Sequence, residues 1–225
     1  MTTMPPVFET ISVIFNPHST GDAPELAAGL REQLREVLPD TVEMRLLPTE
    51  HAGHAVDLAR DAAARPNALV VSVSGDGGYN EVVNGVMAAG DTDTVCAVLA
   101  AGNANDHHRS TSRQPLAQAI AQGQVRQMDL LRLTAGDEPA AKPVYAHSYI
   151  GFGLSPVVAI DMEKGNKGAL KEALSVVRTF AKYRPFRIRD SDGIRQRIDS
   201  LILAEYDNPF WPHCDGLIWP HPGVC

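Results

Sequence analysis

A short segment of glycines and polar residues, Ser74-Gly75-Asp76-Gly77-Gly78-Tyr79-Asn80-Glu81, has the composition of a phosphate-binding loop. Glycine lets the backbone turn sharply and approach a ligand closely. The apolar residues Val82, Val83 and Val86 indicate that a helix follows, and the free N–H groups at a helix start attract phosphate. The segment is not a Walker A motif, because it lacks the Gly-Lys-Ser/Thr ending, and it fails the Gly-x-Gly-x-x-Gly fingerprint, because Asn80 stands where the third glycine would be. Alone, it fits a tight helix-capping turn equally well.

Asp76 requires an explanation of its own, because a carboxylate repels phosphate. Three roles are open: it holds a cation, it orients a hydroxyl group, or it accepts hydrogen bonds from backbone N–H groups of the loop. The residue types alone leave all three open.

A second segment, Ala101-Gly102-Asn103-Ala104-Asn105-Asp106-His107-His108-Arg109, follows a predicted strand that ends at Leu99. The segment Asn16-Pro17-His18-Ser19-Thr20-Gly21 and the residue Thr49 follow two earlier predicted strands in the same way. Loops at the carboxyl ends of parallel strands border the ligand crevice of an open sheet. We therefore predict one shared crevice, with His107 and His108 as a solvated pair on a helix rather than ligand contacts.

The elements that must position these loops follow from hydrophobic periodicity. Short β-branched and apolar runs predict strands at 11–15, 42–47, 69–73, 95–99 and 127–133. Helical spacing predicts helices at about 22–37, 54–65, 79–89 and 116–122. Strands that alternate with helices imply βαβ units and a parallel sheet with flanking helices. We assign residues 1–134 to an α/β nucleotide-binding domain.

The pattern changes after residue 134, where the polar segment 135–142 indicates a boundary. A strand at 144–152, a helix at 167–183 and a hairpin of 186–189 with 194–203 are predicted, with the hairpin turning at Asp192-Gly193. We expect residues 135–225 to form a partial, β-rich second domain.

Composition excludes several classes of protein. The 225 residues carry a net charge of −7, which argues against nucleic acid as a partner. No apolar run is long enough to span a membrane, and residues 1–10 lack the basic region and apolar stretch of a signal peptide, so we predict a cytoplasmic protein. The three cysteines are too few and too scattered for a disulfide framework.

Three motifs together resemble the catalytic domain family of diacylglycerol kinases: Asn-Pro-x-Ser-Thr-Gly, Gly-Asp-Gly-Gly-x-Asn-Glu-Val-Val-Asn-Gly and Gly-Asn-x-Asn-Asp. That family includes bacterial lipid kinases and sphingosine and ceramide kinases, and it is distantly similar to NAD kinases. The resemblance implies an NAD-kinase-like first domain and a β-sandwich-like second domain. It also implies ATP as the phosphate donor, Mg²⁺ as the cofactor and a lipid hydroxyl as the acceptor.

The resemblance also supplies site residues. Asp76 would organise Mg²⁺ or its waters. The family usually has Gly at position 74 and Thr at positions 78 and 103, and it usually has Phe-Ala where His107-His108 stand. Gly78 thus lacks a hydroxyl that could contact phosphate, although its N–H remains. The predicted ATP contacts are Asn16, Thr49, Gly75, Asp76, Gly77, Gly78, Tyr79, Asn80, Glu81, Gly102, Asn103, Asn105 and Asp106.

The end of the chain departs from the family pattern. Asp215 of Asp215-Gly216 is a candidate for the metal loop of the second domain, although its spacing matches poorly. The family's catalytic aspartate lies in a later segment that these residues do not include, so we expect a form with uncertain activity. Three interpretations stay open: a lipid kinase, a soluble kinase of the NAD-kinase type, and an ATP-binding remnant that transfers nothing.

The chain is locally basic from Lys171 to Arg197. This stretch fits a solvated surface, or a surface that meets anionic lipid headgroups. We therefore predict transient, peripheral contact with the inner face of a membrane as well as with a lipid substrate, and leave a homodimer open.

Overall fold

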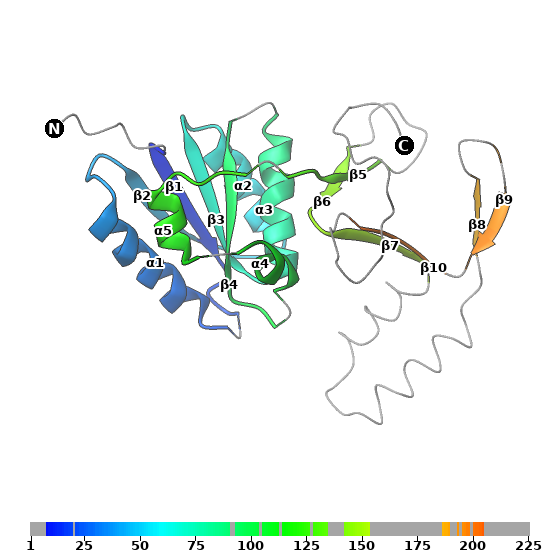
Figure 1. Cartoon of the computed structure of the whole chain (residues 1–225), viewed down its shortest axis with the longest axis horizontal. Helices are drawn as coiled ribbons and strands as arrows, with labels where there is room; N and C mark the ends of the chain where they lie inside the picture. The colour runs from blue at the N-terminus through cyan, green and yellow to red at the C-terminus, as the bar shows by residue number, and fades with distance from the viewer. Residues whose placement is uncertain are drawn as a thin grey trace, which may run out of the picture. The chain divides into compact units, whose positions relative to one another are not determined.

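The computed structural model describes residues 8–19, 21–90, 93–103, 105–112, 114–126, 128–134, 142–153, 186–189, 193, 195–198 and 200–204. The chain divides into two compact units, Met1–His147 and Ser148–Cys225 (Figure 1). The domain boundary predicted after residue 134 falls earlier in the chain than this division. Helix 167–183 and Asp215, both predicted from the sequence, lie outside the described residues.

The first unit is built on a four-stranded sheet, and every neighbouring pair of its strands is parallel. Its strands are β1 (Thr10–Phe15), β2 (Glu43–Pro48), β3 (Ala68–Ser74) and β4 (Val95–Ala100), in the order β2-β1-β3-β4. All four strands were predicted within about two residues. The apolar runs of β1 and β3 are those of strands buried on both faces, whereas β2, at the edge of the sheet, consists of exposed and part-buried residues. The predicted α/β class with a parallel sheet is confirmed.

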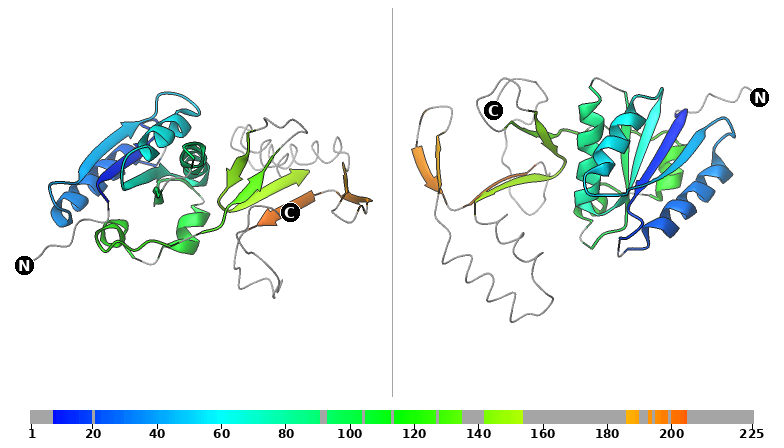
Figure 2. Two further views of the ribbon diagram at one scale, coloured as in Figure 1. Left: turned by 90° about the horizontal axis from the view of Figure 1, so that it is seen from above. Right: turned by 180° about the vertical axis from the view of Figure 1, so that it is seen from behind.

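Helices cover both faces of this sheet (Figure 2). Helices α1 (Ala23–Val37) and α5 (Leu116–Ala121) pack on one face, and α2 (His54–Ala63) and α3 (Asp76–Ala88) on the other. Successive strand residues therefore enter different cores. From β3, Leu69, Val71 and Val73 join the α1 and α5 side, while Val70 joins the α2 and α3 side.

The strand order creates a switch point between β1 and β3. From β1 the chain crosses to β2 on one side, whereas from β3 it crosses to β4 on the other. In open α/β sheets, ligands bind beyond the carboxyl ends of the strands at such a point. The short helix α4 (Asp106–Thr111) comes next in the chain after the carboxyl end of β4.

The remaining strands form small antiparallel pairs. In the first unit, β5 (Leu131–Leu133) pairs with β6 (Val144–Ala146). In the second unit, β7 (Tyr149–Gly153) pairs with β10 (Ser200–Ala204), and β8 (Phe186–Arg189) pairs with β9 (Arg195–Ile198).

Two predicted strands are each divided in the structure. The predicted strand at 144–152 becomes β6 and β7, which have different partners. The predicted hairpin forms from β8 and β9 with Gly193 at a φ of 79°, but residues 200–204 leave it to pair with β7. No helix among the described residues is long and apolar enough to cross a membrane.

Candidate functional site

A pocket of about 680 Å³ lies at the carboxyl edge of the sheet and is lined by residues that follow all four strands. Pockets of this size are typical of small-molecule and cofactor sites. The structure therefore brings together the loops that the sequence predicted to share a crevice. Of the predicted ATP contacts, those that line the pocket are Asn16, Thr49, Gly75, Gly78, Glu81, Gly102 and Asn103.

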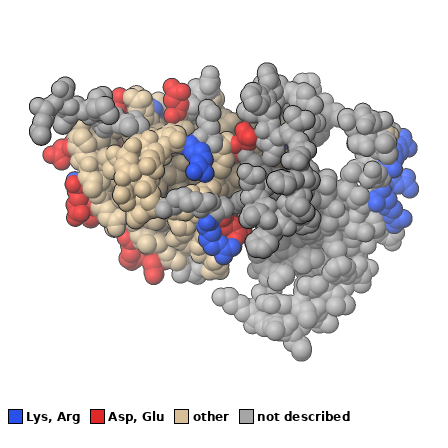
Figure 3. Space-filling view, viewed as in Figure 1, with Lys and Arg blue, Asp and Glu red and all other residues tan. Residues whose placement is uncertain are grey.

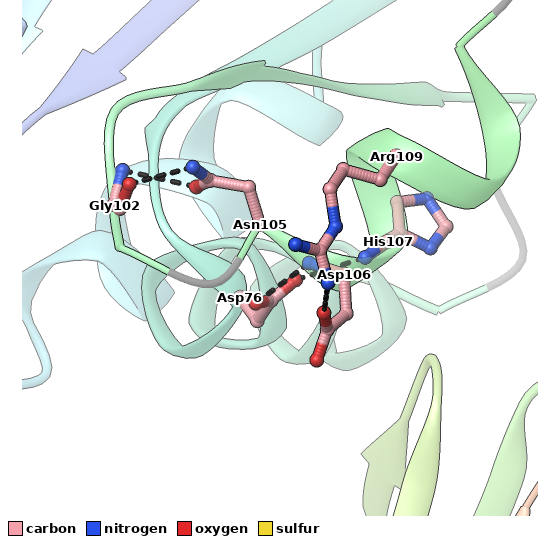
Figure 4. Close-up of polar contacts among 6 residues, drawn as sticks. All are labelled: Asp76, Gly102, Asn105, Asp106, His107 and Arg109. Carbon is pink, nitrogen blue, oxygen red and sulfur yellow. Dashed lines mark hydrogen bonds and ion pairs between the residues drawn. The ribbon is translucent and has the colours of Figure 1, made fainter.

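The loops after β3 and β4 contact each other through two glycines. A Cβ placed on Gly102 would lie 2.5 Å from the Cα of Gly75, closer than real Cβ atoms come to other atoms. The amide of Asn105 holds the second loop by accepting the Gly102 N–H at 3.0 Å and donating to the Gly102 carbonyl at 2.6 Å (Figure 4). Side chains at positions 75 and 102 would separate these two walls of the pocket.

Asp76 also connects the loop after β3 with the segment that follows β4. Its carboxylate accepts the backbone N–H of Asp106 at 3.1 Å and that of His107 at 3.0 Å, at the start of α4 (Figure 4). Burial would raise the pKa of Asp76, but the hydrogen bonds from His107 and Asp106, together with the nearby His147, hold this pKa below its ordinary value. Asp76 thus serves as an acceptor for backbone donors, and two of these donors belong to the start of α4, about 30 positions further along the chain.

The start of α3 is open to a ligand. The helix begins at Asp76, where sequence periodicity had placed its start near Tyr79. Its first backbone bond runs from the Tyr79 N–H to the Gly75 carbonyl at 3.1 Å, and no side chain caps it. The N–H groups of Gly77 and Gly78 therefore precede the first helical hydrogen bond, where a helix attracts anions.

Three aromatic side chains pack together behind the loops. The ring of Tyr79 stacks on that of His107 with centroids 4.8 Å apart, and His147 meets both rings edge-on at 4.8 and 4.9 Å. His107 is only 6% exposed, so its predicted solvation is wrong, although α4 confirms the helix. The sequence could not show this, because Tyr79 and His147 come from distant parts of the chain.

Burial governs the protonation of this aromatic cluster. It lowers the pKa of His147 to about 4, with His107 adding to the effect and Asp76 opposing it. Burial likewise lowers the pKa of His107 against the opposing charge of Asp76. Asn80, a predicted ATP contact, instead shares a hydrogen bond of 3.1 Å with Nδ1 of His147. Tyr79, Asn80, Asp76, Gly77, Asn105 and Asp106 do not line the pocket, and their ATP contacts stay predictions.

Asn84 fixes β6 against α3. Its side-chain amide donates to the Tyr145 carbonyl at 2.8 Å, and its oxygen accepts the Tyr145 N–H at 2.8 Å. This pair of hydrogen bonds satisfies both backbone groups of Tyr145, as a neighbouring strand would, and it holds β6 against α3.

Several residues of the pocket were not predicted as contacts. Ser19 contributes a buried hydroxyl that has no hydrogen-bond partner among the described residues. Ser72 and Ser74, two residues apart on β3, line the wall beside α3. The sequence held a signal for all three. Ser19 belongs to the segment after the first predicted strand, and Ser72 and Ser74, two residues apart, lie on the same face of their strand. Others that line the pocket are His18, Glu50 and His51.

The described residues contain no group of three or more His, Cys, Asp or Glu side chains placed to hold a metal ion. The candidate Asp215 lies outside the described residues and stays a prediction.

Comparisons with known proteins agree with this geometry. The profile of the diacylglycerol kinase catalytic domain matches residues 10–133. No curated protein matches the chain. Among solved structures, a candidate diacylglycerol kinase from Bacillus anthracis str. Sterne is similar, with a TM-score of 0.62, 23% identity, and coverage of 88% of this chain and 68% of the other. A second, from the same organism, has a TM-score of 0.59, 20% identity, and coverage of 87% and 64%.

A third structure, of a diacylglycerol kinase from the same strain, has a TM-score of 0.53 and 19% identity. The match covers 87% of this chain and 62% of the other. At these identities the three structures show a shared fold.

Proposed function

Because this chain belongs to the diacylglycerol kinase catalytic domain family, we propose that it is an ATP-dependent lipid kinase, which transfers the γ-phosphoryl group of ATP to a lipid hydroxyl. The resemblance found in the three sequence motifs is thereby confirmed, while the reaction itself is our proposal. The observation that carries it is the pocket shared by the loops after all four strands.

Phosphate binding by this pocket is supported by three kinds of donor. The first turn of α3 supplies the N–H group of Gly78, which lines the pocket and precedes the first helical bond of α3. The Ser19 hydroxyl is buried, lines the pocket and has no partner among the described residues. A buried hydroxyl without a hydrogen bond is costly, so a phosphate oxygen at this point would satisfy it. Asn103 adds an exposed side-chain amide at the pocket wall.

Mg²⁺ would reach the site with ATP. In kinases it is held by one or two carboxylates together with the substrate phosphates, so a cluster of three protein ligands is not needed. The ion neutralises charge on the phosphate oxygens during transfer. Asp76 fits this role through its ionised carboxylate, whose oxygens keep lone pairs beyond the two N–H bonds they accept.

Contact with a membrane would bring the chain to its lipid acceptor. In the second unit, Arg187 lies directly opposite Arg197 across the β8–β9 pair, and Arg195 lies on the same face of that pair. All three are exposed, and Figure 3 shows basic side chains gathered over this hairpin. Like charges in opposite positions destabilise a strand pair unless an anion lies between them. Anionic headgroups at the cytoplasmic face of a membrane would supply it.

The test compares two acceptors in separate reactions. The chain is incubated with Mg²⁺, γ-labelled ATP, and either diacylglycerol in mixed micelles or NAD in solution. We expect label in the extracted lipid. Label on NAD would overturn the proposal in favour of a soluble kinase, and ATP binding without label on either acceptor would overturn it in favour of a non-catalytic nucleotide-binding protein.

A further inference from the structure

Positions 74 and 78 face each other across the start of α3, at the wall of the pocket. Ser74 ends β3, Gly78 lies in the first turn of the helix, and both line the pocket. The two residues are four positions apart, and the chain turns between them at Gly75. Their side chains therefore compete for one small volume beside the helix N-terminus.

This competition is visible in the distances. A Cβ placed on Gly78 would lie 2.7 Å from the Cβ of Ser74 and 2.7 Å from its Oγ. Real Cβ atoms essentially never approach another atom within 3.0 Å. Rotating the Ser74 side chain would move Oγ but not Cβ, whose position is set by the backbone. Only one of the two positions can therefore carry a side chain without moving the loop.

The hydroxyl of Ser74 can be redirected to a ligand. It donates to the Gly75 carbonyl at 2.9 Å and shares a hydrogen bond of 2.7 Å with the Ser72 hydroxyl. The Gly75 carbonyl also accepts the Tyr79 N–H at 3.1 Å, so it stays satisfied if Ser74 turns its proton elsewhere. Ser72 can at the same time donate to Ser74, because a hydroxyl accepts as well as donates. Ser74 can thus bind an anion without leaving a buried polar group unpaired.

We propose that the Ser74 hydroxyl is a phosphate-binding group of the nucleotide pocket, and that Gly78 is required to make room for it. The two departures at this loop, Ser in place of Gly at 74 and Gly in place of Thr at 78, are then a single exchange. The hydroxyl is delivered from the end of β3 rather than from the first turn of α3. This assignment rests on the proposed function, because it takes the ligand of the pocket to be ATP.

The test is a swap of the two positions, read by calorimetric titration with Mg·ATP and, separately, with adenosine. Ser74→Ala removes the hydroxyl and keeps Cβ, so ATP affinity falls roughly tenfold while adenosine affinity is unchanged. Gly78→Thr binds ATP poorly because its Cβ displaces the loop. The double variant Ser74→Gly/Gly78→Thr restores the hydroxyl from the other side and returns ATP affinity to within about threefold of the wild type.

Ser12→Ala is the matched control, because it removes a buried hydroxyl from β1 that does not line the pocket. A merely structural role for Ser74 would weaken ATP and adenosine alike and would overturn the assignment. So would a double variant that binds ATP no better than Gly78→Thr, or Ser74→Ala at wild-type affinity. If Gly78→Thr fails to fold, Ser74→Ala and the double variant still decide. Failure of the wild type to bind ATP would overturn the proposed function and this assignment together.

Discussion

Asp76 and His107 lie 31 positions apart in the sequence, yet the carboxylate of Asp76 accepts the backbone N–H of His107 at 3.0 Å. With its second bond, to the N–H of Asp106, Asp76 connects the loop after β3 to the helix after β4. An aspartate expected to serve a metal thus also holds two walls of the pocket together.

Replacing Asp76 by Asn tests this connection. The amide keeps one acceptor oxygen but turns an NH₂ group toward the second backbone donor, so one hydrogen bond to a charged group is lost. We expect the free energy of unfolding to fall by about 1 to 2 kcal/mol, measured by urea denaturation at pH 7 without nucleotide. Asp61→Asn, in an exposed ion pair on α2, serves as the control and should leave stability within about 0.5 kcal/mol. Equal stability of the two variants would contradict the role given to Asp76.

Replacing Gly102 by Ala tests the contact between the loops. The new methyl group would meet the backbone of Gly75, which cannot move aside as a side chain would. We expect the thermal midpoint of the first unit to fall and hydrogen exchange to rise in both loops. Gly77→Ala is a suitable control because a Cβ there meets no atom within 4 Å. Similar exchange rates in the two variants would show that the loops do not depend on this close approach.

Acid should destabilise the first unit through His147. Its pKa falls from 6.5 in the unfolded chain to about 4 in the folded one, so between these values the unfolded chain binds more protons. Stability therefore decreases as the pH falls through this range. Because solvent screens part of the effect, we expect a loss on the order of 1 kcal/mol between pH 7 and pH 5. His107 acts in the same direction, whereas Asp76 stays ionised because its pKa is lowered.

The variant His147→Phe keeps an aromatic ring and removes this titration. Urea denaturation at pH 7 and pH 5 should therefore show a smaller loss for the variant than for the wild type. An equal loss in both proteins would exclude His147 as the titrating group.

The arginines of the β8–β9 hairpin should govern binding to anionic vesicles. Replacing Arg187, Arg195 and Arg197 by Gln should lower the affinity for phosphatidylglycerol vesicles about a hundredfold, since each residue contributes about 1 kcal/mol. Sedimentation with the vesicles measures this affinity. Replacing Arg31, Arg35 and Arg60 by Gln changes the net charge equally, but these arginines pair with carboxylates on α1 and α2. Equal weakening by both triple variants would show an effect of net charge and refute a specific surface.

The sequence predicted the sheet and its loops because these depend on local patterns. Buried apolar runs identify β1 and β3, and glycine-rich segments mark the turns that follow strands. Strand ends in a parallel sheet meet at one edge, so the loops could be placed together without knowing their contacts. The pocket confirms this part of the prediction.

What the sequence did not show depends on partners far along the chain. The burial of His107 depends on the rings of Tyr79 and His147. The helix α3 begins at Asp76, three residues before the predicted start, with Gly75 as its N-cap. The division of the segment after residue 143 reflects the bonds between Asn84 and Tyr145. Residue type and spacing do not specify such pairings.

Calorimetric titration of Mg·ATP is the most direct test of a nucleotide site at this edge of the sheet. The wild type should bind one ATP, and Gly77→Asp should weaken binding tenfold or more by placing a negative charge beside the phosphates. Gly77→Asn, of the same size but neutral, should bind nearly as the wild type does, since position 77 is open and exposed. Absence of ATP binding by the folded wild type, or equal affinity in the Asp and Asn variants, would contradict the account.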